Sequence, residues 1–155
     1  MSVAFRRESD EEHLEPRFEL PIPPGPNLVT SRGLDQIRAR NAELEARLEG
    51  ELSEDERKAV LRDARYWRQR LASAELAPLA DGRQVAFGTR VTFVRDGKTH
   101  ALDLVGLDES EPAANRIAFT APLARALIGA EVGDEVEFAG SDQPIIVTAI
   151  EVPGA

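Results

Sequence analysis

Hydrophobic residues in the middle of the chain repeat at helical spacing. Two series of apolar positions, each interrupted at most once, recur at intervals of three and four residues between residues 30 and 77. The series are Leu34, Ile37, Asn41, Leu44, Leu48 and Val60, Ala64, Trp67, Leu71, Ala74. Each is an a/d pattern about two heptads long, as in short coiled-coil helices. Because only a polar turn separates them, the pattern predicts an antiparallel helical hairpin over residues 30–77.

Residues at the ends of these predicted helices carry signals for starting and stopping. Thr30 or Ser31 can cap the first helix, and Gly50 is suited to end it. Ser53, followed three residues later by Glu56, is a capping-box signature for the second helix. The free end of the hairpin is therefore expected near residues 50–55.

From residue 85 onward the pattern changes to the alternation typical of strands. VAFGTRVTFVR alternates apolar and polar residues, Asp96-Gly97 is a hairpin-turn signal, and THALDLVG follows as the partner strand. RIAFT, DEVEF and PIIVTAIEV predict further strands. PLARALIG, with Pro122 near its first position and Gly129 after its end, predicts a short helix. We therefore expect an α+β protein in which residues 80–155 form about five antiparallel strands and one short helix.

The first 29 residues show neither period. They contain five prolines surrounded by charged residues, namely Pro16, Pro21, Pro23, Pro24 and Pro26. Proline removes backbone donors and biases the preceding residue toward extended structure. The composition predicts a Pro-rich extended arm over residues 1–29, either docked on its own domain or a partner, or solvated as a tail.

Composition narrows the classes of function. The chain has 155 residues, a formal net charge of −9 and no cysteine. The acidic balance argues against a broad basic surface for nucleic acid, and the lack of cysteine excludes disulfides and thiolate metal sites. No apolar run approaches the roughly 20 residues needed to span a bilayer, and no signal peptide is visible. We expect a cytoplasmic protein without a membrane partner.

Candidate chemistry is concentrated in the acidic stretch LEGELSEDER, residues 48–57, at the expected free end of the hairpin. Neither His13 nor His100 has a neighbour at metal-ligand spacing, and no phosphate loop or nucleophile motif is present. Carboxylates at a helix start complement the macrodipole, so these residues suit a purely structural role as well as a chemical one.

One segment of the second half is similar to a known family. TAPLARALIGAEVGDEVEF, residues 120–138, resembles the bacterial Gre transcript-cleavage factors (GreA/GreB), whose second domain carries a segment like SPxARALLGKxVGD. FGTRVTF (87–93) and DLVGLDESEP (103–112) resemble other segments of that domain. VTSRGLDQI (29–37) resembles the entry to the family's first helix. The likeness covers about residues 27–152.

The resemblance implies an architecture and a partner. Residues 80–155 would form an FKBP-like half-barrel that docks on RNA polymerase at the mouth of the secondary channel, with the coiled-coil hairpin pointing down the channel. The polymerase-binding residues implied are Thr120, Ala121, Pro122, Leu123 and Arg125. Other members have Asp or Asn, then Ser, at the first two of these positions.

The resemblance also implies a role for the free end of the hairpin near residues 50–55, its tip. In the family, two carboxylates there help the polymerase active site hold a Mg²⁺ that activates water to cut the RNA. Glu51 and Glu54, with Asp55 as an alternate, are the corresponding candidates, although Asp55 and Lys58 replace the family's Asn and Tyr. A hard cation prefers oxygen ligands, and a second metal stabilises both attacking and leaving oxygens. The protein would then be a monomeric accessory factor with no cofactor of its own, not an independent enzyme.

The second predicted helix also carries basic residues, which are Lys58, Arg62, Arg65, Arg68 and Arg70. In a Gre-like setting these side chains would touch nascent RNA or DNA in the elongation complex, or acidic residues of the channel. The alternative is a solvated charged face.

Two other functions remain open. One is a regulator that occupies the same channel without stimulating cleavage, which the short hairpin and the altered tip favour. The other is a peptidyl-prolyl isomerase, which only the implied FKBP-like fold suggests. Its aromatic pocket would have to use Phe87, Phe93, Phe119 and Phe138, which lie at alternating positions typical of core residues.

Overall fold

The computed structural model describes residues 19–154, which divide into two compact units. The helical unit comprises residues 19–25 and 38–72, and the sheet unit comprises residues 26–37 and 73–154. Residues 1–18, most of the predicted arm, lie outside the described residues, as does His13. The domain boundaries expected from the sequence, 1–29, 30–77 and 80–155, stay predictions.

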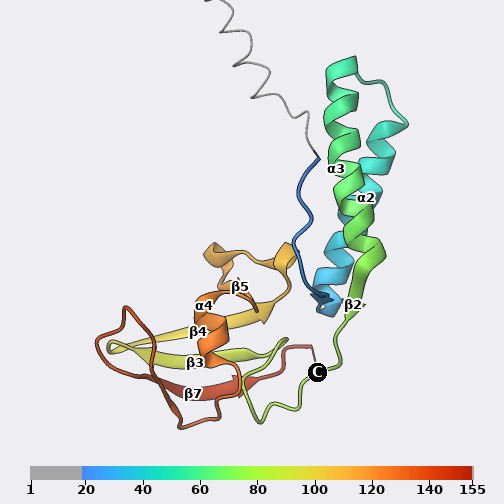
Figure 1. Ribbon diagram of the computed structural model, residues 1–155. Helices are drawn as coiled ribbons and strands as arrows, with labels where there is room; N and C mark the ends of the chain where they lie inside the picture. Colours follow the sequence, from blue (N-terminus) through green and yellow to red (C-terminus); the bar gives the residue numbers. More distant parts are fainter. Residues whose placement is uncertain (1–18, 155) are drawn as a thin grey trace, which may run out of the picture. The chain divides into compact units, whose positions relative to one another are not determined.

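Two long helices dominate the first part of the chain. Helix α2 (Ser31–Leu48) and helix α3 (Glu54–Ser73) lie side by side and are joined by residues 49–53 (Figure 1). In the helical unit Leu44, Val60 and Ala64 are buried together, with Leu48, Leu52 and Trp67 packed against them. These are the apolar positions that the sequence predicts, apart from Leu52. No helix of residues 19–154 is long and apolar enough to cross a membrane.

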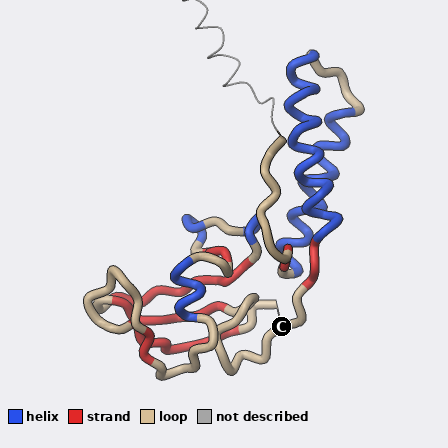
Figure 2. The backbone as a smooth tube through the Cα atoms, viewed as in Figure 1, coloured by secondary structure: helices blue, strands red, loops and turns tan. Residues whose placement is uncertain are grey.

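The larger sheet of the sheet unit has five strands in the order β5-β4-β3-β7-β6, and strands are drawn in red in Figure 2. The strands are β3 (Arg90–Arg95), β4 (Lys98–Val105), β5 (Arg116–Ala118), β6 (Glu135–Val136) and β7 (Ile145–Glu151). Helix α4 (Pro122–Leu127) buries Ala124 and Leu127 in one core with Phe93, Leu104 and Ile145 of the sheet. Helix and sheet together make the mixed α+β architecture expected from the sequence.

Local sequence signals set the boundaries of several elements. The β3–β4 hairpin turns at Asp96 and Gly97, with φ of 49° and 80°, the pair of positive values that a type I′ turn requires. Pro122 stands in the first turn of α4, and Gly129 follows that helix with φ of 96°. These three predictions are confirmed.

The expectation of a purely antiparallel sheet was wrong at one edge. Strand β5 pairs with β4 in parallel, with Asp103, Leu104 and Val105 opposite Arg116, Ile117 and Ala118. Between the two strands the chain passes through two 3-10 turns, η1 (Leu107–Glu109) and η2 (Pro112–Ala114). This crossover of about ten residues returns the chain in its original direction, which a tight hairpin cannot do.

A second, two-stranded sheet was not foreseen. Strands β1 (Asn27–Val29) and β2 (Ala74–Leu76) pair in parallel, immediately before α2 and immediately after α3. The side-chain amide of Asn27 also donates to the Ser73 hydroxyl over 3.2 Å. The sheet unit therefore holds the start of α2 as well as the chain that leaves α3.

Candidate functional site

The loop that joins α2 to α3 is fixed at its end by a reciprocal cap. The backbone N–H of Ser53 donates to the Glu56 carboxylate over 2.9 Å, and the N–H of Glu56 donates to the Ser53 hydroxyl over 3.1 Å. This is the predicted capping box, and it satisfies two donors at the start of α3. These two hydrogen bonds therefore fix the backbone conformation at which the loop enters α3.

Arg57 fixes the other side of the same loop. Its guanidinium donates to the carbonyl oxygens of Leu48 and Gly50, over 3.0 and 3.2 Å. The Leu48 carbonyl is among those left without a helical partner where α2 ends, and the Gly50 carbonyl belongs to the loop that follows. Sequence reasoning missed this role, yet a signal existed: a cation is disfavoured in the first turn of a helix unless it has a local acceptor.

The candidate carboxylates lie on this fixed loop and its following turn. Glu51, Glu54 and Asp55 are all exposed, whereas Leu52 between them packs against the core of the helical unit. Within residues 19–154 no group of three or more His, Cys, Asp or Glu side chains is arranged to hold a metal. Exposed carboxylates of this kind can contribute oxygen ligands to a hard cation that another molecule already holds in part.

Glu56 provides a titration test of the cap. Donation from the backbone and then the hydroxyl of Ser53 holds the pKa of Glu56 below its ordinary value of 4.5. Because the folded pKa is the lower one, the cap stabilises fully above the unfolded value and is lost as pH falls through the folded value. We expect carboxyl NMR to give a midpoint below 4.5, which rises in Ser53→Ala but not in Ser141→Ala. A midpoint of 4.5 in the unaltered chain would contradict the cap.

The implied polymerase-binding turn lies in the sheet unit, directly before α4. Thr120, Pro122 and Arg125 are exposed, whereas Ala121 and Leu123 are half-buried against the core. The Ala121 N–H donates to Ala118 over 2.9 Å, and its carbonyl accepts from the Arg125 N–H over 2.9 Å. The structure therefore brings these five residues together on one supported turn, with alternate side chains free to meet another surface.

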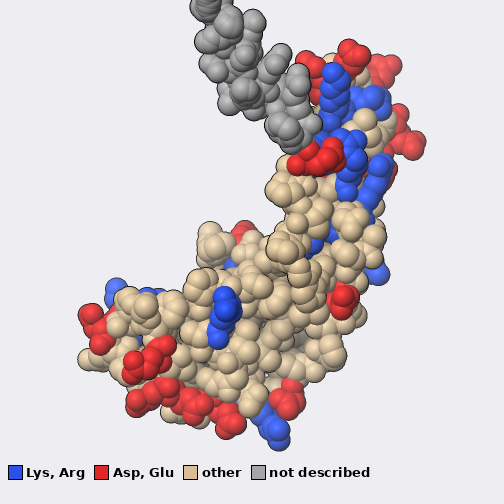
Figure 3. Space-filling view, viewed as in Figure 1, with Lys and Arg blue, Asp and Glu red and all other residues tan. Residues whose placement is uncertain are grey.

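The basic residues of α3 do not form one free face. Arg68 donates a hydrogen bond of 2.9 Å to Glu45 through Nη2. Arg65 donates two hydrogen bonds, of 2.6 and 2.7 Å, to the carboxylate of Glu19. These bonds lower the pKa of Glu45 and of Glu19 below 4.5. Arg70 is buried, with 1% exposed, and its guanidinium lies 5.9 Å from the ring centre of Tyr66. On the visible face of the helical part, acidic side chains gather at its upper end, and basic side chains lie below and among them (Figure 3).

The aromatic residues of the sheet unit serve mainly in packing. Phe93 is buried in the core and Phe138 packs against it. Phe87 and Phe119 meet edge to face, with ring centres 5.3 Å apart.

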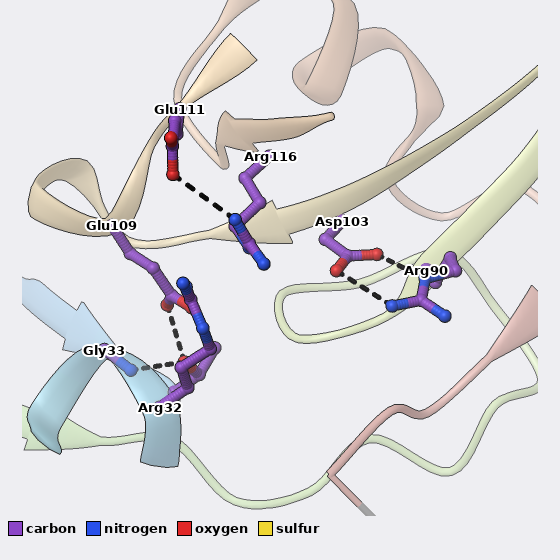
Figure 4. Close-up of polar contacts among 8 residues, drawn as sticks. Arg32, Gly33, Arg90, Asp103, Glu109, Glu111 and Arg116 are labelled. Carbon is purple, nitrogen blue, oxygen red and sulfur yellow. Dashed lines mark hydrogen bonds and ion pairs between the residues drawn. The ribbon is translucent and has the colours of Figure 1, made fainter. Parts of the chain in front are cut away.

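A buried carboxylate in the sheet unit was also missed. Glu109, 6% exposed, accepts from the Thr30 hydroxyl over 2.6 Å and from Arg32 over 3.0 Å (Figure 4). The same hydroxyl oxygen accepts from the Gly33 N–H over 2.9 Å, so Thr30, and not the alternative Ser31, caps α2. The signal for Glu109 was weak because DESEP has the composition of a solvated loop.

Sequence comparison with known proteins identifies the class of this chain. A family profile described as "Transcription elongation factor, GreA/GreB, C-term" matches residues 80–153. Transcription elongation factor GreA of Beijerinckia indica is 33% identical over 115 residues, covering 66% of this chain and 73% of that protein. The chain belongs to the GreA/GreB family.

Other relatives show how far the likeness extends. Transcription elongation factor GreB of Neisseria meningitidis is 42% identical over 81 residues, or 48% of each chain. The match therefore spans about half the length of that relative. GreA factor homolog 1 (Gfh1) of Thermus thermophilus superposes with a TM-score of 0.38 at 16% identity, covering 82% of this chain and 99% of that one.

Proposed function

We propose that this protein is a transcription elongation factor of the Gre type, which binds bacterial RNA polymerase at its secondary channel and modulates elongation. The observation that carries the proposal is the supported turn before α4. Its exposed Thr120, Pro122 and Arg125 belong to the segment that matches the family. In this proposal the sheet unit is an FKBP-like half-barrel that docks, and α2 and α3 are a coiled-coil hairpin that enters the channel.

The chemistry proposed for the tip is that of an accessory factor. Glu51 and Glu54, with Asp55 as an alternate, would lend oxygen ligands to a Mg²⁺ of the polymerase active site, which would activate water for RNA cleavage. The capping box and Arg57 support this role, because they hold the loop while leaving these carboxylates exposed. The chain alone would turn nothing over, and it would act as a monomer beside nascent RNA or DNA.

Helix length favours a second candidate, a regulator that occupies the channel without stimulating cleavage. The 20 residues of α3 make a rod of about 30 Å, and a short rod limits how far the tip carboxylates can reach. Asp55 and Lys58, which depart from the family's tip, favour the same candidate. The peptidyl-prolyl isomerase hypothesis has less support, because Phe93, one of the four aromatic residues that its pocket would need, is buried in the core.

One experiment separates these functions. Stalled elongation complexes incubated with the protein and Mg²⁺ should yield shortened transcripts if the tip delivers ligands. In the Glu51→Ala/Glu54→Ala variant this cleavage should fall at least a hundredfold, because two metal ligands are lost. Glu49→Ala, on the same exposed loop, is the matched control and should retain cleavage.

Two other results would decide between the proposed functions. Slower elongation without shortened transcripts would support the non-cleaving regulator. A chain that neither binds core polymerase in co-sedimentation nor changes elongation would overturn the proposed function as a whole.

A further inference from the structure

A cavity of about 420 Å³ lies entirely within the sheet unit. It is lined by the start of α2, by the segment that follows β2, by residues of β3, β4 and β5, and by the chain after β7. A volume of this size is typical of sites for small molecules. Neither the acidic tip nor the turn before α4 contributes to it, so the proposed function leaves the cavity unexplained.

Several residues that line the cavity are apolar. Leu104 is fully buried, and Phe87 meets Phe119 edge to face. Leu76 and Leu79 also line the cavity and are 59% and 66% exposed. Large apolar side chains that remain exposed around a hollow provide a surface that an apolar ligand can cover.

Charged residues of the same lining carry a positive balance. Three arginines from separate elements line the cavity, Arg32, Arg90 and Arg116, against the two carboxylates of Asp103 and Glu109. The lining thus has one net positive charge in a chain whose formal net charge is −9. This local reversal of sign favours an anionic occupant.

Arg116 is the arginine best placed to meet that anion. Arg90 is engaged by both carboxylate oxygens of Asp103, over 2.6 and 3.2 Å. Arg116 makes a single longer contact of 3.3 Å, through Nη1, with Glu111, and a guanidinium has five donors. Figure 4 shows Arg116 extending from β5 toward the space between Glu109 and Asp103.

We propose that this cavity binds a small amphipathic anion. Its carboxylate or phosphate head would accept hydrogen bonds from Arg116, and its apolar body would lie against Phe87 and Leu79. An arginine fork suits either oxyanion, so the head group is left to the experiment. The proposal rests on the cavity's lining alone and does not depend on polymerase binding.

Simple aromatic anions test the proposal. Phenyl phosphate and benzoate, each titrated into the ¹⁵N-labelled full chain, compare the two heads on one apolar body. At least one should produce saturable NMR shifts at the amides of Leu79, Gly88 and Arg116. Inorganic phosphate and benzyl alcohol, which lack one half of the ligand, should bind at least tenfold more weakly.

Two variants test the cationic and the apolar residues of the lining separately. Arg116→Gln should weaken binding of the preferred anion about tenfold, the value of a charge-assisted hydrogen bond. Leu79→Ala, at an exposed position where folding is not at risk, should weaken it severalfold. Arg83→Gln, a side chain 84% exposed and outside the lining, is the matched control and should leave affinity unchanged.

Three results would overturn the proposal. They are the lack of saturable shifts with both anions, shifts confined to residues outside the cavity, and unchanged affinity in both Arg116→Gln and Leu79→Ala. A dispersed amide spectrum for each variant shows that it is folded, so that lost binding is not lost structure.

Discussion

Replacing Gly106 with alanine is expected to lower the free energy of unfolding by about 3 kcal/mol. A Cβ at this position would lie 2.4 Å from the carbonyl oxygen of Leu28 in β1. The obstacle is backbone, which cannot rotate away as a side chain can, so the strand itself must shift. Gly106 is therefore required for the close approach of β1 to the end of β4, not for a turn.

Urea denaturation followed by the amide NMR signals of core residues such as Phe93 and Leu104 measures this loss. These signals report the sheet unit, whereas Trp67, the single tryptophan, lies in the helical unit. Gly50→Ala is the matched control, since its Cβ would meet only Arg47 O at an ordinary 3.6 Å. It should change stability by less than about 0.5 kcal/mol. Equal urea midpoints for the two variants would show that β1 shifts away from the added Cβ without a loss of stability.

The parts of the fold that the sequence predicts are those governed by local chemistry. Ser53 and Glu56 cap a helix through atoms three residues apart, and Asp96-Gly97 sets its turn by its own dihedral angles. Strands β1 and β2 escaped prediction because three residues carry no period, and their pairing joins residues about 47 positions apart. The direction of β5 is less distant in sequence, but no local signal sets it, since it depends on the crossover through η1 and η2.

The residues of the candidate site likewise fall into those that local sequence signals predict and those that they do not. The acidic tip was visible as composition, and the capping box located it at the start of α3. The turn at Thr120–Pro122 was found only through the family resemblance, because nothing in its own chemistry marks it. Arg57 and Glu109 were missed because each acts on partners that the sequence alone does not bring near: loop carbonyls in one case and the start of α2 in the other.

Replacing Glu109 with alanine is expected to cost about 2 kcal/mol, the second large effect. Its buried carboxylate accepts from Thr30 and Arg32, so the variant leaves a half-buried hydroxyl and a half-exposed cation without their acceptor. Glu109→Gln keeps the shape of the side chain and one acceptor oxygen, so its free energy of unfolding should fall about half as much. Glu111→Ala removes a carboxylate that is 60% exposed, and it should cost less than about 1 kcal/mol.

A double-mutant cycle decides whether Glu109 acts through the cap of α2. Thr30→Val removes both the donor to Glu109 and the acceptor for the Gly33 N–H. If the carboxylate holds this hydroxyl in place, Glu109→Ala should cost at least about 1 kcal/mol less in the Thr30→Val background. Urea midpoints of the four proteins measure the coupling. Strict additivity would mean that Glu109 stabilises the sheet unit through Arg32 or its own burial, and that Thr30 caps the helix without it.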